Sequence, residues 1–437
     1  MRKHLYYRGR TLKSLTFYER AESLEQAANR PMSPLPAPIA TADLPTGSAG
    51  SSLSAEFQLL LRCSTPASGG SAKLDVQSLV ESAPEWPRVL QLAEQHGVGP
   101  TLYPALRNDP KVPAAVLDQL RGVSEHHARK NLKFAGELLR ILDCLDSHAI
   151  PAIPLKGPVL AERLFGDLAQ RDFSDLDVML RARDVERATS ALRTMNYVPQ
   201  MSLSVAERGA YLRHGYEYTL DGPAGRNLLE IQWNVLPRFY AVDFDCDGFF
   251  QRATTAQLAG RTVRTLCAED LLLTLCVHAA KHTWSRLCWI RDIAGVVQCQ
   301  SIDWEQIAAR ARELGISRIV GVSLLLTHRL LSTDVPDRMQ ELWRTDAAIG
   351  PLSAETIKTM RSRDGTSTES LGYFRQMLGL RERTRDKIRF LHRLALTPGK
   401  GEWSAIRLPA PLFPLYRIVR LFRLMGRLLG SRGDMAR

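Results

Sequence analysis

The 437-residue chain lacks the usual features of secreted and membrane-spanning proteins. Its seven cysteines form no C-x-x-C pair and are odd in number, so we expect reduced thiols in a cytoplasmic protein. Residues 1–30 are polar and basic, without the apolar stretch of a secretory signal, and no run of about 18 apolar residues predicts a membrane span. The composition, 45% hydrophobic and 24% charged, is near the globular mean and excludes collagen-like, wholly disordered and disulfide-scaffold classes.

The net charge of +12 is concentrated near the end of the sequence. Residues 381–437 contain 14 Lys and Arg against 4 Asp and Glu, so the remaining 380 residues are almost neutral. This distribution predicts a basic tail surface rather than a nucleic-acid-binding protein as a whole.

A helical pattern in residues 412–430 places four tail arginines within an arc of about 120°. These are Arg417, Arg420, Arg423 and Arg427. Such a helix can lie on an anionic membrane, on RNA or on an acidic partner, and would make the protein peripheral at a membrane in the first case. The alternative is that its apolar side packs against the protein's own helices.

Composition and periodicity divide the chain into five segments. Residues 31–54 are dense in Pro, Ser, Ala and Gly and cannot bury enough apolar surface to order themselves; a leader from an upstream start codon is another explanation of residues 1–54. We expect a disordered, basic and Pro/Ser-rich leader at 1–54, a helical N-terminal domain at 55–148, an α/β module at 149–250, a helical domain at 251–335 and a helical basic C-terminal extension at 336–437.

The α/β module is predicted from a change of hydrophobic period. Strands are expected at 149–155, 175–180, 216–220 and 228–235, and helices at 159–165 and 185–195. The fold class expected is therefore α+β, with a small mixed or antiparallel sheet flanked by helical segments.

Two aspartates alternate with apolar residues in Ser174-Asp-Leu-Asp-Val-Met-Leu. Residues i and i+2 of a strand share a face, so Asp175 and Asp177 project together while Leu176 and Val178 face the core. Two close carboxylates repel unless a cation lies between them, and Mg²⁺ or Mn²⁺ with oxygen ligands is the usual solution. A bare D-x-D is otherwise a solvated strand face.

A second strand alternates in the same way. In Leu229-Glu-Ile-Gln-Trp-Asn, Glu230 and Gln232 face away from Ile231 and Trp233. If this strand is the antiparallel neighbour of the first, Glu230 lies beside the two aspartates, and three carboxylates can hold the two metals of an in-line phosphoryl displacement. The alternative is an ordinary polar sheet face.

A lysine and a glycine occupy a predicted strand-to-helix turn, Pro154-Leu-Lys-Gly-Pro. Gly157 would let the backbone approach a phosphate at a helix N-terminus, and Lys156 would add a positive charge. The spacing of a Walker A loop is absent, and such a pair can also be a simple turn.

Together these residues resemble the DNA polymerase β-like nucleotidyltransferase superfamily. The chain is more closely similar to a bacterial nucleotidyltransferase family with L-K-G, R-x-x-S/T-D-x-D and E-x-H-W motifs, and the similarity extends over roughly residues 55–437, including 278–295 and the tail. The resemblance implies that Asp175, Asp177 and Glu230 bind metal and are catalytic. It also implies that a nucleotide is bound by four further residues: Lys156, Gly157, Arg171 and Ser174.

Two departures from the family pattern affect this assignment. Lys156-Gly157 stands where the superfamily has Gly-Ser, so phosphate binding differs in detail. Gln232 stands where the E-x-H-W motif has histidine, so any metal or proton role of that histidine is lost or weakened in this chain.

His278 and His282 share a helix face and leave three interpretations open. A zinc site lacks the glutamate of H-E-x-x-H and obvious further ligands. A helix lining the nucleotide site would also present Lys281, Trp284, Arg286, Trp289 and Asp292. Plain helix packing is the third.

The leading functional hypothesis is a metal-dependent nucleotidyltransferase that moves an NMP from an NTP to a hydroxyl of a protein, sugar, peptide or RNA. A non-catalytic nucleotide-binding or scaffold protein with the same fold is the second hypothesis. A membrane- or RNA-associated adaptor acting through the basic tail is the third.

Overall fold

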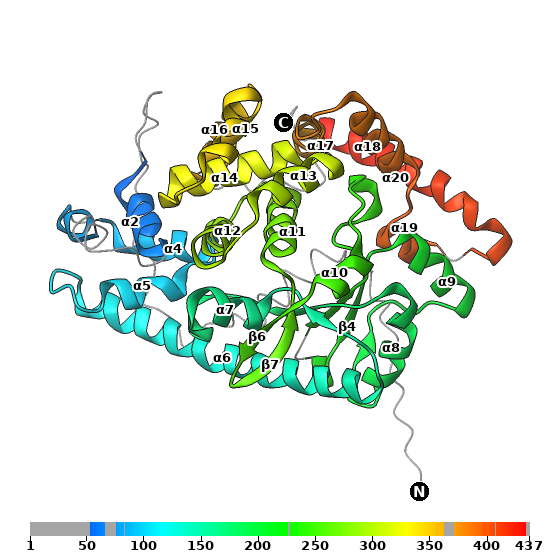
Figure 1. Ribbon diagram of the computed structural model, residues 1–437, viewed down its shortest axis with the longest axis horizontal. Coiled ribbons are helices and arrows are strands. Elements are labelled where there is room, and N and C mark those ends of the chain that lie inside the picture. Colours follow the sequence, from blue (N-terminus) through cyan, green and yellow to red (C-terminus); the bar gives the residue numbers. More distant parts are fainter. Residues whose placement is uncertain are drawn as a thin grey trace, which may run out of the picture. The chain divides into compact units, whose positions relative to one another are not determined.

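A five-stranded mixed sheet is the part of the fold that carries the predicted site (Figure 1). The computed structural model describes residues 53–65, 76–82, 84–225, 228–361, 371–406 and 408–433. The predicted leader, residues 1–54, lies outside this part of the chain except for its last two residues. The division of the remainder into separate domains stays a prediction.

The sheet has the strand order β1-β2-β5-β4-β3. The strands are β1 (Ile153–Pro154), β2 (Asp175–Met179), β3 (Val198–Pro199), β4 (Glu217–Asp221) and β5 (Leu228–Gln232). β2 and β5 are parallel, whereas the other three pairings are antiparallel. The expected α+β class with a small mixed sheet is thus confirmed, but the antiparallel pairing expected between the two carboxylate strands is wrong.

The register of β2 and β5 determines which side chains share a face. Asp177 pairs with Glu230 and Val178 with Ile231, and in-register partners point to the same side of a sheet. The acidic side chains therefore lie on one face, while the other is apolar and buried.

Two helices cover the apolar face of the sheet, α6 (Ala114–Ser147) and α8 (Val185–Arg193) (Figure 1). In α6, Phe134, Leu138, Ile141 and Leu145 follow each other at intervals of three and four residues, which places them on one stripe. These side chains are buried in the same apolar cluster as the inward residues of β2 and β5. Burial of this stripe holds the sheet in place.

Helices before and after the sheet build a second apolar core. Its principal helices are α2 (Ala55–Ser64), α4 (Trp86–Gln95), α5 (Gly99–Leu106), α7 (Gly157–Phe165), α11 (Ala268–Lys281), α12 (Leu287–Cys299), α13 (Trp304–Leu314), α14 (Ser317–Leu331), α15 (Asp337–Thr345) and α16 (Ile349–Arg361). Further helices of the chain are α9 (Val205–His214), α10 (Cys246–Arg252), α17 (Leu371–Gly379), α18 (Thr384–Leu396), α19 (Lys400–Ala405) and α20 (Tyr416–Gly433).

A β-hairpin that the sequence did not predict precedes α11. Its strands are β6 (Thr254–Leu258) and β7 (Arg261–Thr265). Most of their side chains are exposed and polar. The sequences of the two strands therefore lack the alternation of apolar and polar residues by which a strand is predicted.

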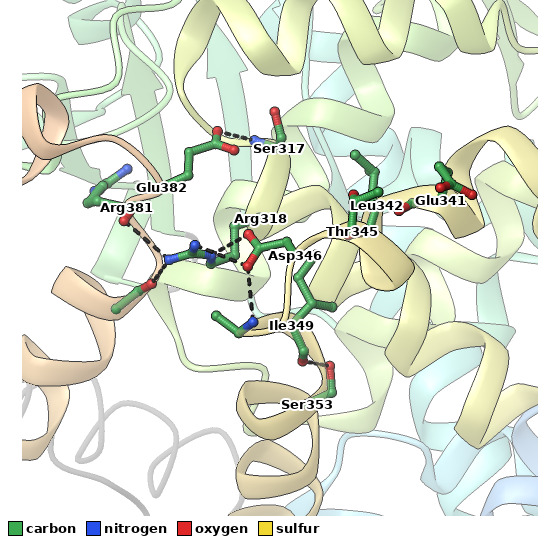
Figure 2. A network of polar contacts seen from close by, with 12 residues as sticks. Ser317, Arg318, Glu341, Leu342, Thr345, Asp346, Ile349, Ser353, Arg381 and Glu382 are labelled. Carbon is green, nitrogen blue, oxygen red and sulfur yellow. Dashed lines mark hydrogen bonds and ion pairs between the residues drawn. The ribbon is translucent and has the colours of Figure 1, made fainter.

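Arg318 connects three segments of the helical part (Figure 2). Its Nε and Nη2 donate to the two carboxylate oxygens of Asp346 at 2.7 and 3.1 Å, and its Nη1 donates to the Gly379 carbonyl at 2.6 Å. Nearby, the Ser317 amide donates to Glu382 at 2.9 Å. The start of α14 is thereby joined to the α15–α16 turn and to the chain before α18.

The C-terminal segment packs onto the sheet module through aromatic side chains. Trp403 and Tyr416 belong to the apolar cluster on the sheet's buried face, and their rings lie 4.1 Å apart by centroid. Trp403 also meets the Tyr211 ring edge-on at 6.3 Å. The segment around α19 and the start of α20 is therefore part of the module's core.

All seven cysteines fall in the described part of the chain and have free thiols. Cys63 and Cys276 are buried, and burial raises the pKa of each thiol to about 12. None of the helices in the described ranges is both long and apolar enough to cross a membrane.

His96, at the end of α4, makes stability dependent on pH. It is fully buried against Phe57, and burial, assisted by the charge of Arg286, lowers its pKa from 6.5 to about 4. Because the unfolded chain binds the proton more tightly, the free energy of unfolding falls as the pH drops from about 6.5 towards about 4, by at most about 3 kcal/mol for this group. Melting temperatures at pH 7 and pH 5 measure the effect.

His96→Leu should reduce the difference between the two melting temperatures. His392→Leu, at an exposed position, is the matched control for loss of a histidine. An unchanged pH dependence in His96→Leu would contradict the assignment.

Candidate functional site

Three predicted carboxylates share the polar face of β2 and β5. Asp175 is half-buried at the start of β2, Asp177 is 5% exposed, and Glu230 is half-buried opposite it. The structure thus brings together the side chains that the alternation predicted, on parallel strands.

Gln232 links two of the carboxylates. Its Nε2 donates to Asp177 Oδ1 at 2.7 Å and lies 3.3 Å from Glu230 Oε2. The amide supplies hydrogen-bond donors where the family pattern would place an imidazole, and it fixes Asp177 and Glu230 within reach of one nitrogen atom.

The charge of this face perturbs the protonation of Asp175. Burial and the neighbouring Asp177 charge together raise its pKa to about 6, against the opposing effect of Lys156 and Arg171. A carboxyl group in this position is stabilised in its ionised form by an additional positive charge.

Lys156 supplies positive charge at the turn between β1 and α7. Its Nζ lies 3.3 Å from Asp177 Oδ2, and the attraction of Asp177, Asp175 and Glu230 raises its pKa against the opposing effect of burial. Gly157 follows with φ of +60° at the first position of α7, a conformation that favours glycine. The predicted strand–turn–helix is therefore present.

Two further charged residues belong to the site. Glu217 of β4 is opposite Gln232 in the register and only 3% exposed, and it lies on the same face as the three carboxylates. Lys281, at the end of α11, feels the charges of Glu217 and Glu230, and burial lowers its pKa despite them. The sequence analysis did not name Glu217, although the alternation of Glu217, Tyr218 and Thr219 could have indicated it. It named Lys281 only as one of several residues on its helix.

Arg171 forms a buried ion pair. Its Nε and Nη2 donate to the carboxylate of Asp292 in α12 at 2.9 to 3.1 Å, and both side chains are buried. This bidentate pair anchors the segment that leads into β2. Ser174 is exposed just before that strand, and nucleotide contacts of Arg171 and Ser174 stay predictions.

A family model described as an uncharacterised nucleotidyltransferase matches residues 82–332, more than half of the chain. The chain belongs to this nucleotidyltransferase family. The matched range includes Lys156, the three carboxylates and Lys281.

Two solved structures are also similar to this chain. Both are of the antibiotic-resistance factor ANT(2″)-Ia, one in solution and one in complex with adenylyl-2″-tobramycin, at 14% and 13% identity. Each similarity covers 42% of this chain and 91% or 97% of the other, with a TM-score of 0.31, too low to carry an argument about substrate. No curated protein matches the chain.

The histidines of α11 pack on an aromatic ring. His278 and His282 lie 5.6 and 4.9 Å from the Trp289 ring by centroid, and burial lowers the pKa of both imidazoles. Trp284, expected beside the nucleotide, is instead fully buried and donates to Ser323. Over the described ranges, no three His, Cys, Asp or Glu side chains lie close enough together to hold a metal ion as they stand, and this includes the three carboxylates of the acidic face.

The chemistry of the carboxylates suits a hard divalent cation. Three carboxylates supply oxygen ligands, and the raised pKa of Asp175 reflects mutual repulsion and burial that a cation would relieve. Both oxygens of Asp177 have nitrogen partners, Lys156 and Gln232, so these contacts would have to loosen for all three carboxylates to serve as ligands.

Proposed function

We propose that this chain transfers an NMP from an NTP to a hydroxyl acceptor. The observation that supports this most is the pairing of Asp177 with Glu230 on neighbouring strands, with Asp175 on the same face and Lys156 beside it. Family membership supports the proposed reaction class, and we propose the acidic face as its site.

In the proposed reaction, an oxygen of the acceptor forms a bond to the α-phosphorus and the bond from that phosphorus to the bridging oxygen breaks. Pyrophosphate is released, and Glu230 accepts the proton of the hydroxyl. Lys156 and Lys281 stabilise the charge on the phosphates. Both ammonium groups feel the charges of the acidic face and so stand near the phosphates of a nucleotide bound there.

Asp175, Asp177 and Glu230 are the residues that would hold Mg²⁺ or Mn²⁺. When bound, the cation would supply charge neutralisation and Lewis-acid polarisation of the phosphates. Gln232 would keep Asp177 and Glu230 oriented towards each other, in place of the family's histidine.

A second candidate is nucleotide binding without transfer. It is favoured by the pairing of both Asp177 oxygens with Lys156 and Gln232, which neutralises the face without a metal. The lysines would still attract a triphosphate, but the carboxylates would stay engaged with the protein.

Transfer of label from the α-phosphate distinguishes the two candidates. We expect purified full-length protein, with Mg²⁺ and each of the four NTPs in turn, to incorporate α-phosphate label into a fraction of a cell lysate. The γ-phosphate label should be released in pyrophosphate, and Glu230→Gln should abolish both signals.

If the protein binds nucleotide but consumes it with none of the lysate fractions, the second candidate is supported. Incorporation of the γ-phosphate label would contradict both candidates, because it indicates phosphoryl rather than nucleotidyl transfer.

A further inference from the structure

Large apolar side chains are exposed on two neighbouring C-terminal helices. On α20, Ile418, Leu421, Phe422 and Met425 are 39 to 66% exposed. On α18, Ile388 and Leu391 are 63 and 50% exposed. The two helices lie side by side, and Arg420 donates to the Leu394 carbonyl between them (Figure 1).

This exposure is concentrated in one segment of the chain. Among the described residues, nine of twelve exposed large hydrophobic side chains fall within residues 388–425, three of them at 406–415. Scattered single exposures are ordinary in proteins, but a concentration of this size marks an interaction surface.

The orientation of α20 is the reverse of an ordinary amphipathic surface helix. Arg420 is buried, and Arg420 and Arg423 each pair with Glu402 at 3.2 Å. Tyr416, on the same stripe, is fully buried. The side of Tyr416, Arg420 and Arg423 therefore packs against the protein, whereas Arg417 and the exposed apolar side chains face outward.

We propose that the exposed face of α18 and α20 docks on the surface of an anionic membrane. Phe422, Ile418 and Met425 would enter the boundary between headgroups and acyl chains, as apolar faces of interfacial helices do. Exposed Arg385 and Arg417, on the same two helices, would attract anionic headgroups.

The charge and the orientation of the helix favour lipid over two other occupants. RNA is recognised by outward basic and stacking groups, whereas two arginines of α20 are engaged with Glu402. A second copy of the chain would bring two strongly basic tails together, and like charges across an interface oppose association. An anionic bilayer complements both the apolar and the basic character of this surface.

Vesicle co-sedimentation of the full-length protein tests the proposal. The vesicles are phosphatidylcholine alone, or phosphatidylcholine with phosphatidylglycerol. We expect binding to the anionic vesicles, weakened at high salt, and reduced about tenfold or more in Ile418→Ser/Phe422→Ser. Arg417→Gln, which removes an exposed charge from the same helix, should weaken it about fivefold.

Leu132→Ser is the matched control, because Leu132 is 61% exposed on α6, outside the C-terminal surface. It should leave binding unchanged, and all variants should keep the parent melting temperature. Absence of binding to anionic vesicles, or equal binding by the double variant, would overturn the proposal. So would a concentration-dependent dimer that the double variant abolishes, or binding to an RNA homopolymer in place of vesicles.

Discussion

Asp177→Asn should lower nucleotide transfer by at least about a thousandfold while the protein remains folded. Asp177 is the carboxylate in contact with Lys156 and Gln232 and in register with Glu230, so its charge organises the acidic face. Loss of several kcal/mol of charge stabilisation in the transition state corresponds to this factor. The amide has the same size and retains an acceptor for Gln232, and Lys156 keeps the charges of Asp175 and Glu230 nearby.

The assay is transfer of α-phosphate label, with the melting temperature measured in parallel. Asp221→Asn is the matched control, because Asp221 ends the neighbouring strand β4 and is paired with Leu228, away from Glu230. It should retain transfer. Near-normal transfer by Asp177→Asn would rule out the proposed role of the carboxylates.

Asp270→Asn should lower the free energy of unfolding by about 3–5 kcal/mol, because it removes one charge from a buried ion-pair network. Asp270 is fully buried in the first turn of α11. Its carboxylate accepts from Arg252 Nε at 2.9 Å and from Arg310, so it joins α10, α11 and α13. Thermal unfolding of the variant and the parent protein measures the effect.

The exposed pair between Glu305 and Arg338 provides the comparison. Glu305→Gln should change the free energy of unfolding by less than about 1 kcal/mol. Water screens the attraction between exposed charges, and each side chain is hydrated when the pair is broken. Similar melting temperatures for the two variants would show that the Asp270 network is not a main source of stability.

The acidic face could be predicted because its pattern is local. Asp175 and Asp177 alternate with buried Leu176 and Val178, and this alternation alone identifies the two faces of a strand. The direction of the neighbouring strand could not be predicted in the same way, because the same alternation is compatible with a parallel and with an antiparallel neighbour. It depends on how the chain crosses from β2 to β5 through β3, α9 and β4.

Long-range pairings account for most of what the sequence did not predict. Glu217 and Lys281 belong to the site because β4 and α11 meet there, far apart in the chain. Helical periodicity separates the arginine and apolar sides of α20, but Glu402 and Trp403 decide which side is buried. The sequence left open which side is buried, and in the structure Phe422, on the apolar side, is 66% exposed.

The salt bridge between Arg171 and Asp292 limits how small a piece of this chain can carry the acidic face by itself. The two residues are 121 positions apart, and the aspartate belongs to a helix well beyond residues 149–250. Transfer of residues 149–250 alone into an unrelated scaffold would leave Arg171 without its counter-ion and the acidic face without Lys281. The transferred segment has to reach through α12, so that the sheet, α10, α11 and α12 move together.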